Sequence, residues 1–220
     1  MSISDRQRAE FVARVTADVT HELRNVLATV KETAGLVHDL MTFDQPDSID
    51  HDKVKSLVGR IEPQTERGVE LASVLQLLVA QCGEGSGLAT NLNHAAAQVV
   101  VMCHRRARKK RQSVRIRPHD HQVDVVGERL GVYMAIHAAI ESALELLPES
   151  AVLDIHIGTP VDGASVDFMG SLNKSNIQID PTQAVAWNTL NNAVADVGAS
   201  LTVGKIECSL RIRFPATSTG

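Results

Sequence analysis

The sequence has few aromatic residues, few cysteines and no long apolar run, and each shortage argues against a class of protein. Aromatic residues make up 3% of the 220 positions, which argues against a base-stacking platform for single-stranded nucleic acid. The cysteines, Cys82, Cys103 and Cys208, are odd in number and far apart, so we expect no disulfide framework and a reducing, cytoplasmic setting. No apolar run approaches the length of a membrane span, and the polar start MSISDRQRAE does not resemble a signal peptide.

Charge is nearly balanced along the chain as a whole. The 22 basic and 26 acidic side chains leave a net charge of −4, so the chain is neither unfolded by self-repulsion nor a general polyanion binder. A hydrophobic content of 44% is ample for one large domain or two small ones. With so few aromatics, the core is expected to be aliphatic.

An apolar stripe at helical spacing runs through residues 5–42 and predicts one long helix. Its members recur at steps of three or four and repeat every eleven residues: Val12, Val15, Val19, Leu23, Val26, Val30, Ala34, Val37 and Met41. A helix of this length, about 55 Å at 1.5 Å per residue, cannot be buried inside a small globule. It must pack lengthwise on a partner.

A second helix is predicted after FDQPDSID, with Asp50 as its N-cap. Its stripe comprises Val54, Leu57 or Val58, Ile61, Thr65, Gly68, Ala72, Leu75, and Leu78 or Val79. Pro63 lies inside this stripe and is expected to kink the helix or split it in two. A single helical hairpin has only one interface, so half of each stripe would stay exposed. We therefore expect a homodimer in which two hairpins form a four-helix bundle.

The segment GEGSGLAT, residues 83–90, is typical of a linker. We accordingly predict a helical hairpin over 1–83, a linker over 84–90, an α/β sandwich over 91–217 and a tail over 218–220. Within the sandwich the pattern predicts three helices, over 91–111, over 128–147 and from Asp180 to Gly198, the last with Asp180 as N-cap and Pro181 in its first turn. It also predicts six strands, over 113–117, 122–126, 153–157, 164–168, 200–203 and 207–214. This order predicts one mixed or antiparallel sheet with helices on one face.

The sharpest local feature is THELRNVL, residues 20–27, in the middle of the first helix. His21 lies roughly 200° around the helix from the apolar stripe, Asn25 shares its face, and Glu22 and Arg24 flank it. An exposed imidazole beside a carboxylate is a good nucleophile toward phosphorus. Glu22 could accept a proton or orient the ring, and the Asn25 amide could position a water or an incoming oxygen. Taken alone, the same residues also fit the solvated polar face of a long helix.

In context, HELRN on a long helix, a returning helix, a linker and an α/β sandwich resemble the sensor histidine kinases of two-component systems. In that family the HExx[NT] box marks the phosphorylated histidine of a dimerisation and phosphotransfer domain, which here corresponds to His21. Three segments resemble the opening helix and strand, the N-box helix, and the last helix and terminal hairpin of the family's ATP-binding domain: NLNHAAAQVVVMCHRRARKKRQSVRIRP, VGERLGVYMAIHAAIESALELLP and AWNTLNNAVADVGASLTVGKIECSLRIRFP. The resemblance implies a GHKL-like α/β fold.

The nucleotide-binding boxes of that family are missing, however. The predicted helix 128–147 contains no Asn, and the positions closest to the N box hold Ile136 or His137 and Ile140 or Glu141. The DxGxG box is reduced to Asp167 and Gly170, and QAVAW replaces the later glycine-rich box. Only about ten residues, 170–180, are left for the ATP lid. These departures imply that the chain neither binds nor hydrolyses ATP.

A phosphohistidine hairpin joined to a domain without nucleotide-binding boxes resembles the histidine phosphotransferases of phosphorelays. The resemblance implies that Nε2 of His21 takes a phosphoryl group from the aspartyl phosphate of one receiver domain and passes it to another. Glu22 would be the acid/base partner, with Asn25 and Arg24 in support. We expect no cofactor of the chain's own, because the receiver would bring Mg²⁺. The expected partners are receiver domains of response regulators and a second copy, with a hybrid histidine kinase as a candidate phosphate donor. The alternatives are a non-catalytic pseudokinase adaptor and a receiver phosphatase.

A basic segment, residues 104–117, contains eight Lys or Arg and no acid. Cations suit the end of a helix, so a solvated face explains it, and docking of acidic partners is the functional alternative. Since no aromatics are interleaved with the cations, no nucleic acid is expected. His119, Asp120, His121 and Asp124 match no standard zinc spacing, so we expect a polar turn there and no metal.

Overall fold

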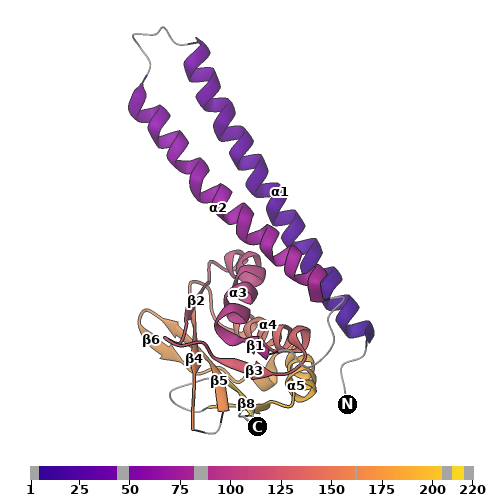
Figure 1. Cartoon of the computed structure of the whole chain (residues 1–220). Coiled ribbons are helices and arrows are strands. Elements are labelled where there is room, and N and C mark those ends of the chain that lie inside the picture. Colours follow the sequence, from indigo (N-terminus) through magenta and orange to yellow (C-terminus); the bar gives the residue numbers. More distant parts are fainter. Residues whose placement is uncertain (1–4, 44–49, 82–88, 162, 205–209, 216–220) are drawn as a thin grey trace. The chain divides into compact units, whose positions relative to one another are not determined.

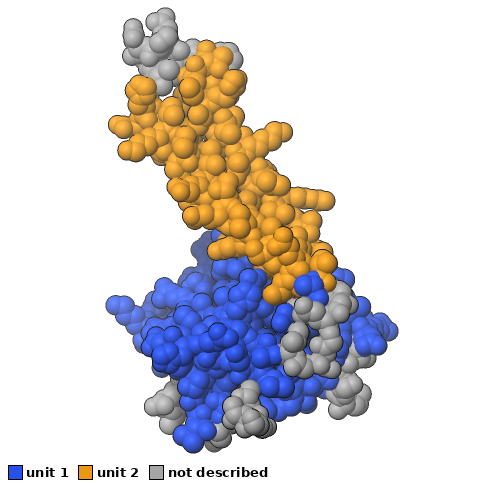
Figure 2. Space-filling model, in the orientation of Figure 1, with its two compact units in different colours: residues 1–13, 80–220 blue, residues 14–79 orange. Residues whose placement is uncertain are grey.

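The computed structural model describes residues 5–43, 50–81, 89–161, 163–204 and 210–215. The chain divides into two compact units (Figure 2): residues 14–79, called here the helical unit, and residues 1–13 with 80–220, called the α/β unit. The predicted boundary at 83 and the tail 218–220 lie outside the described residues, as does most of the predicted linker. The last two residues of that linker, Ala89 and Thr90, belong to strand β1 (Ala89–Asn91).

Two long helices account for the first part of the chain (Figure 1). Helix α1 spans Asp5–Phe43 and helix α2 spans His51–Gln81, which confirms both predicted helices. Asp50 caps α2 as predicted, because its carboxylate accepts a hydrogen bond from the backbone N–H of Lys53 at 3.0 Å. Of the two outcomes predicted at Pro63, a kink or a split, the split is wrong, since α2 continues through this residue. Pro63 and Gly59 are both exposed, so water can bond the carbonyl that proline leaves without a donor.

The buried seam of the helical unit follows a seven-residue spacing rather than the predicted eleven. Its buried members are Val15, Val19, Glu22, Val26 and Thr33 on α1, and Leu57, Leu71, Val74 and Leu78 on α2. Spacings of seven are typical of left-handed packing between long helices. The predicted stripe therefore combined two neighbouring faces. The α1 seam contains Glu22, whereas Leu23 is only half-buried, and the α2 seam contains Leu71 and Val74 instead of Ala72 and Leu75.

Besides the start of α1, the described residues of the α/β unit form three α-helices and two sheets. The helices are α3 (Leu92–Lys109), α4 (Arg129–Leu146) and α5 (Trp187–Asp196). The strands are β1 (Ala89–Asn91), β2 (Ser113–Arg117), β3 (Asp124–Val126), β4 (Val152–Gly158), β5 (Gly163–Leu172), β6 (Ser175–Ile177), β7 (Ser200–Thr202) and β8 (Leu210–Pro215). The larger sheet has the order β2-β4-β5-β8-β7, with β6 also paired to β5.

The larger sheet is mixed, as predicted: β2 and β4 are parallel and the other pairs are antiparallel. Side chains alternate between its faces, so Leu153 and Ile155 of β4 are buried while Asp154 and His156 are only half-buried. Helices α3, α4 and α5 contact strands of this sheet. The prediction of a single sheet is wrong, because β3 pairs with β1 in a separate two-stranded sheet.

The segment between β5 and α5 also differs from prediction. Strand β5 is longer than predicted and turns back into β6 through Asn173 and Lys174, whose φ angles of 52° and 67° are left-handed. Asp180 caps a helical turn as predicted, accepting from Thr182 N–H at 3.1 Å, but that turn is a separate 3₁₀ helix, η2 (Pro181–Gln183). The predicted single helix is interrupted because the N–H of Val185 donates to the Glu145 carboxylate of α4 instead of to its own helix.

Candidate functional site

His21 lies on the solvent side of α1 with an exposed side chain. Asn25, one turn further along the helix, places its amide Nδ2 at 3.3 Å from His21 Nδ1. Residues four apart lie on the same helix face, so the structure brings these two predicted site residues together. Arg24 is also exposed, next to them on α1. A rigid helix thus presents an imidazole whose second nitrogen, Nε2, is directed away from its amide partner.

The contact with Asn25 bears on which nitrogen of His21 carries the proton. If the amide nitrogen donates to Nδ1, a neutral ring has its proton on Nε2. If the amide is turned so that its oxygen faces Nδ1–H, the lone pair of Nε2 is free for attack. Asn25 therefore has the chemistry to select the nucleophilic form of the ring.

Glu22 faces the α1–α2 seam, whereas His21 faces solvent. Glu22 is 7% exposed in this seam, and its carboxylate forms an ion pair with the Arg67 guanidinium of α2. The structure thus separates Glu22 from the other three predicted site residues, and its acid/base role stays a prediction. Sequence reasoning missed Arg67. The available signal was a pair of opposite charges at seam positions of two helices that otherwise bury apolar side chains.

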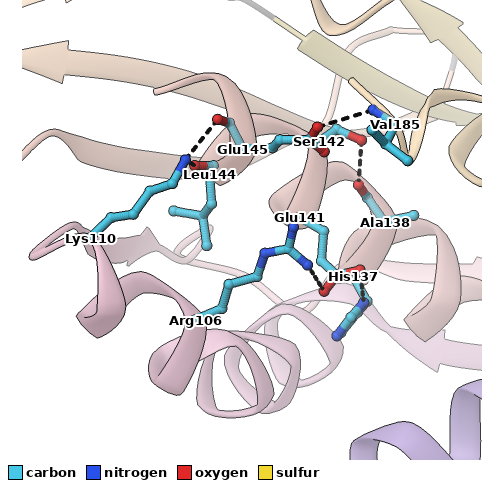
Figure 3. Close-up of polar contacts among 9 residues, drawn as sticks. All are labelled: Arg106, Lys110, His137, Ala138, Glu141, Ser142, Leu144, Glu145 and Val185. Atoms are coloured by element: carbon cyan, nitrogen blue, oxygen red, sulfur yellow. Dashed lines mark hydrogen bonds and ion pairs between the residues drawn. The ribbon is translucent and has the colours of Figure 1, made fainter. Parts of the chain in front are cut away.

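A second polar cluster joins α3 and α4 in the α/β unit (Figure 3). Arg106 Nη1 lies 2.7 Å from Glu141 Oε1, and His137 Nδ1 lies 3.7 Å from Glu141 Oε2. His137 and Glu141 are 5% and 9% exposed, and α4 is buried at every position from Leu130 to Leu144. Two of the four candidate N-box positions, His137 and Glu141, therefore contact each other within the α/β unit, and Glu141 also pairs with Arg106.

The two remnants of the DxGxG box also have internal contacts. Asp167 accepts two hydrogen bonds from Arg211, at 2.5 and 2.8 Å, across the paired strands β5 and β8. A Cβ atom on Gly170 would lie 2.5 Å from Leu147 Cδ2, so any larger residue would force Leu147 to shift where β5 approaches the end of α4. Both residues are thus explained by packing of the α/β unit.

Part of the basic segment 104–117 closes the C-terminal end of α4. Lys110 Nζ donates to the carbonyl oxygens of Leu144 and Glu145 at 3.2 and 2.8 Å (Figure 3). Gln112 Nε2 donates to the carbonyl oxygens of Leu144 and Leu147 at 3.1 and 2.7 Å. The last carbonyls of a helix lack partners within it, and these side chains supply them. At least these members of the segment, together with Arg106, have structural contacts.

The histidines near residue 120 lie in the bend between β2 and β3. The N–H of His121 approaches His119 Nδ1 at 3.2 Å, and Thr159 Oγ1 lies 3.3 Å from His119 Nε2. Within the described residues, no three His, Cys, Asp or Glu side chains gather as a metal site would need. Cys103 is buried and forms no disulfide within the described residues, whereas Cys82 and Cys208 lie outside them. No helix in the described part of the chain is both long and apolar enough to cross a membrane.

Comparison with solved structures bears on the α/β unit. The catalytic domain of histidine kinase ThkA matches with a TM-score of 0.50 and 14% sequence identity, covering 60% of this chain and 99% of that chain. This unit has the fold of a histidine kinase catalytic domain. The histidine kinase AdeS of Acinetobacter baumannii is similar over 90% of this chain and 98% of its own, with a TM-score of 0.49 and 11% identity. No family model and no curated protein matches the chain.

Proposed function

We propose that this chain is a histidine phosphotransferase of a two-component phosphorelay, with His21 as the residue that carries the phosphoryl group. The observation that carries the proposal is the exposed His21 ring on a long helix, beside the Asn25 amide. The histidine kinase fold of the α/β unit supports a role in two-component signalling. The partners would be receiver domains of response regulators.

In the proposed reaction, the receiver supplies most of the catalytic machinery. Its aspartyl phosphate is already activated, and its bound Mg²⁺ would offset the charge on the transferred group. The chain contributes a fixed nucleophile, His21. The exposed Arg24, three residues further along α1, can offset the negative charge of the phosphoryl group. The same geometry runs in reverse when phospho-His21 meets a second receiver.

The α/β unit supports transfer without ATP. Glu141 forms an ion pair with Arg106 and faces His137, so this carboxylate already has a cationic partner from α3. Asp167 is bonded to Arg211, and a two-residue turn connects β5 directly to β6. The carboxylates nearest to the family's N box and DxGxG box, Glu141 and Asp167, thus have partners within the α/β unit, which supports the proposal.

The exposed apolar residues of the helical unit support the proposed homodimer. Leu27, Met41 and Val58 are 59%, 62% and 51% exposed, although their neighbours at helical spacing are apolar. On α1 a second stripe of exposed or half-buried apolar residues lies beside the buried seam: Leu23, Leu27, Val30, Ala34, Val37 and Met41. Contiguous exposed apolar surface is typical of association sites, and two hairpins packed through these stripes would form a four-helix bundle.

The proposal is tested by mixing phosphorylated receivers with the chain, with His21→Ala and with Asn25→Ala. A phosphotransferase becomes labelled, and His21→Ala does not. A receiver phosphatase accelerates the release of free phosphate without label on the chain, and that activity depends on Asn25. An adaptor leaves the receiver's lifetime unchanged. Either of the last two results contradicts the proposal and identifies the alternative that replaces it.

A further inference from the structure

Consecutive residues of α1 face opposite environments at the proposed phosphorylation site. His21 is exposed and Glu22 is buried in the α1–α2 seam with Val19 and Val26. Successive side chains on an α-helix diverge by about 100°, so a seam that takes Glu22 turns His21 toward solvent. A buried carboxylate is costly unless it is paired, and its partner decides where it stays.

Arg67 is that partner, from the facing helix. The two side chains are only 14% and 9% exposed, for Arg67 and Glu22 respectively. Gly68 lies next to Arg67, and a Cβ atom there would be 3.5 Å from Val26 Cγ1 and 3.9 Å from Leu23 Cδ1. The helices are thus in contact directly beside the ion pair. The packing and the ion pair together hold the Glu22 carboxylate inside the hairpin.

Phosphoryl transfer from an aspartyl phosphate does not require this carboxylate as a base. The lone pair of His21 Nε2 forms the new N–P bond, while the P–O bond to the receiver's aspartate breaks and its electron pair leaves with that carboxylate. A neutral imidazole with its proton on Nδ1 loses no proton in this step. The leaving carboxylate is a weak base, with an ordinary pKa of about 3.9, so it needs no acid. The ring needs only an acceptor for Nδ1–H, which the Asn25 amide oxygen can provide.

We propose that Arg67 is a positioning residue that keeps Glu22 away from His21, leaving Asn25 alone to orient the ring. This inference rests on the proposed function and refines the role of its site residues. A freed Glu22 carboxylate would compete with Asn25 for Nδ1–H and would repel the oxygens of an incoming phosphoryl group. The ion pair with Arg67 prevents both effects.

The first test reads the ring directly, by the ¹⁵N NMR shifts of the His21 nitrogens, assigned with His21→Ala. Asn25→Ala should change the ratio of the Nδ1–H to the Nε2–H tautomer of His21, whereas Glu22→Gln should leave this ratio unchanged. Arg67→Met should also change the tautomer ratio, and Glu22→Gln/Arg67→Met should return it to the value of the parent protein. A Glu22→Gln shift as large as that of Asn25→Ala would overturn the inference.

The second test measures reactivity without any receiver, using phosphoramidate as the phosphoryl donor. Arg67→Met should slow phosphorylation of His21 by about five- to tenfold, the order of effect of one uncompensated charge nearby. The double variant should return to within about twofold of the parent, because it removes both buried charges. A folded double variant that remains as slow as Arg67→Met would refute the positioning role.

These tests separate the inference from the proposed function. If receivers do not transfer phosphate to the chain, the proposed function fails, yet the ring signals and phosphoramidate reactivity still report on Arg67. Since Arg67→Met leaves a buried charge unpaired and can unfold the hairpin, circular dichroism is recorded for each variant. If Arg67→Met unfolds, the test relies on the reactivity of the double variant Glu22→Gln/Arg67→Met.

Discussion

Replacing Gly170 by alanine tests the packing between β5 and the end of α4. The new Cβ would lie 2.5 Å from Leu147 Cδ2, 3.4 Å from Cγ and 3.5 Å from Cδ1. Carbon atoms in contact are optimally separated by about 3.5–4.0 Å, so the overlap with Cδ2 is about 1 Å. Leu147 is 2% exposed and cannot simply swing into solvent.

The expected cost is the difference between two effects. Overpacking of this kind costs about 1–3 kcal/mol, while replacing glycine by alanine recovers about 0.5–1 kcal/mol by restricting the unfolded chain. Gly170 has no left-handed φ angle that alanine would strain. We therefore expect Gly170→Ala to lower the free energy of unfolding by about 1–2 kcal/mol. Urea denaturation followed by circular dichroism measures this.

A double-mutant cycle identifies the cause. Leu147→Ala removes the overlapping atoms and by itself costs about 2–5 kcal/mol, but in its presence Gly170→Ala should become neutral or stabilising. Gly35→Ala on α1, where nothing lies within 4 Å of the new Cβ, is the matched control and should be neutral or stabilising by up to about 1 kcal/mol. Strict additivity of Gly170→Ala and Leu147→Ala would refute the reasoning.

Three further predictions concern the cap of α2, an ionisable core residue and association. Asp50→Ala should lower the free energy of unfolding by about 1 kcal/mol, because it removes the N-cap of α2. In the same denaturation experiment the control Asp52→Ala should lower it by less. Burial raises the pKa of Tyr133 to about 12, so its contribution to stability is complete below pH 10 and is lost as pH rises toward 12. Tyr133→Phe should flatten that alkaline loss in pH-dependent melting, and an unchanged slope would contradict the burial. Leu27→Lys should shift the mass measured by light scattering toward the monomer, and a monomeric parent would contradict the dimer.

The elements that local patterns determine were predicted well. Strand 113–117 was predicted with its observed bounds because SVRIR alternates cleanly, and Asp50 and Asp180 cap where predicted because capping depends on a few neighbouring residues. Strands β1 and β6, of three residues each, lie in stretches without an alternating apolar pattern. They exist because a neighbouring strand pairs with them.

At the candidate site, the sequence indicated which residues share a face but not what lies opposite them. His21 and Asn25 were placed together because a helix fixes that relation within one turn. Arg67 is 45 positions from Glu22, and their pairing depends on how α2 is aligned against α1. That alignment comes from the packing of Leu71, Val74 and the other seam residues, which no local pattern specifies.

The most direct test of the central claim is to locate the phosphoryl group on the chain. The protein is incubated with a phosphorylated receiver in the absence of nucleotide and then analysed by mass spectrometry under neutral conditions. The account predicts one acid-labile phosphoryl group on His21, which a second receiver removes. Absence of the modification at His21, or its appearance only when ATP is supplied, would contradict the account.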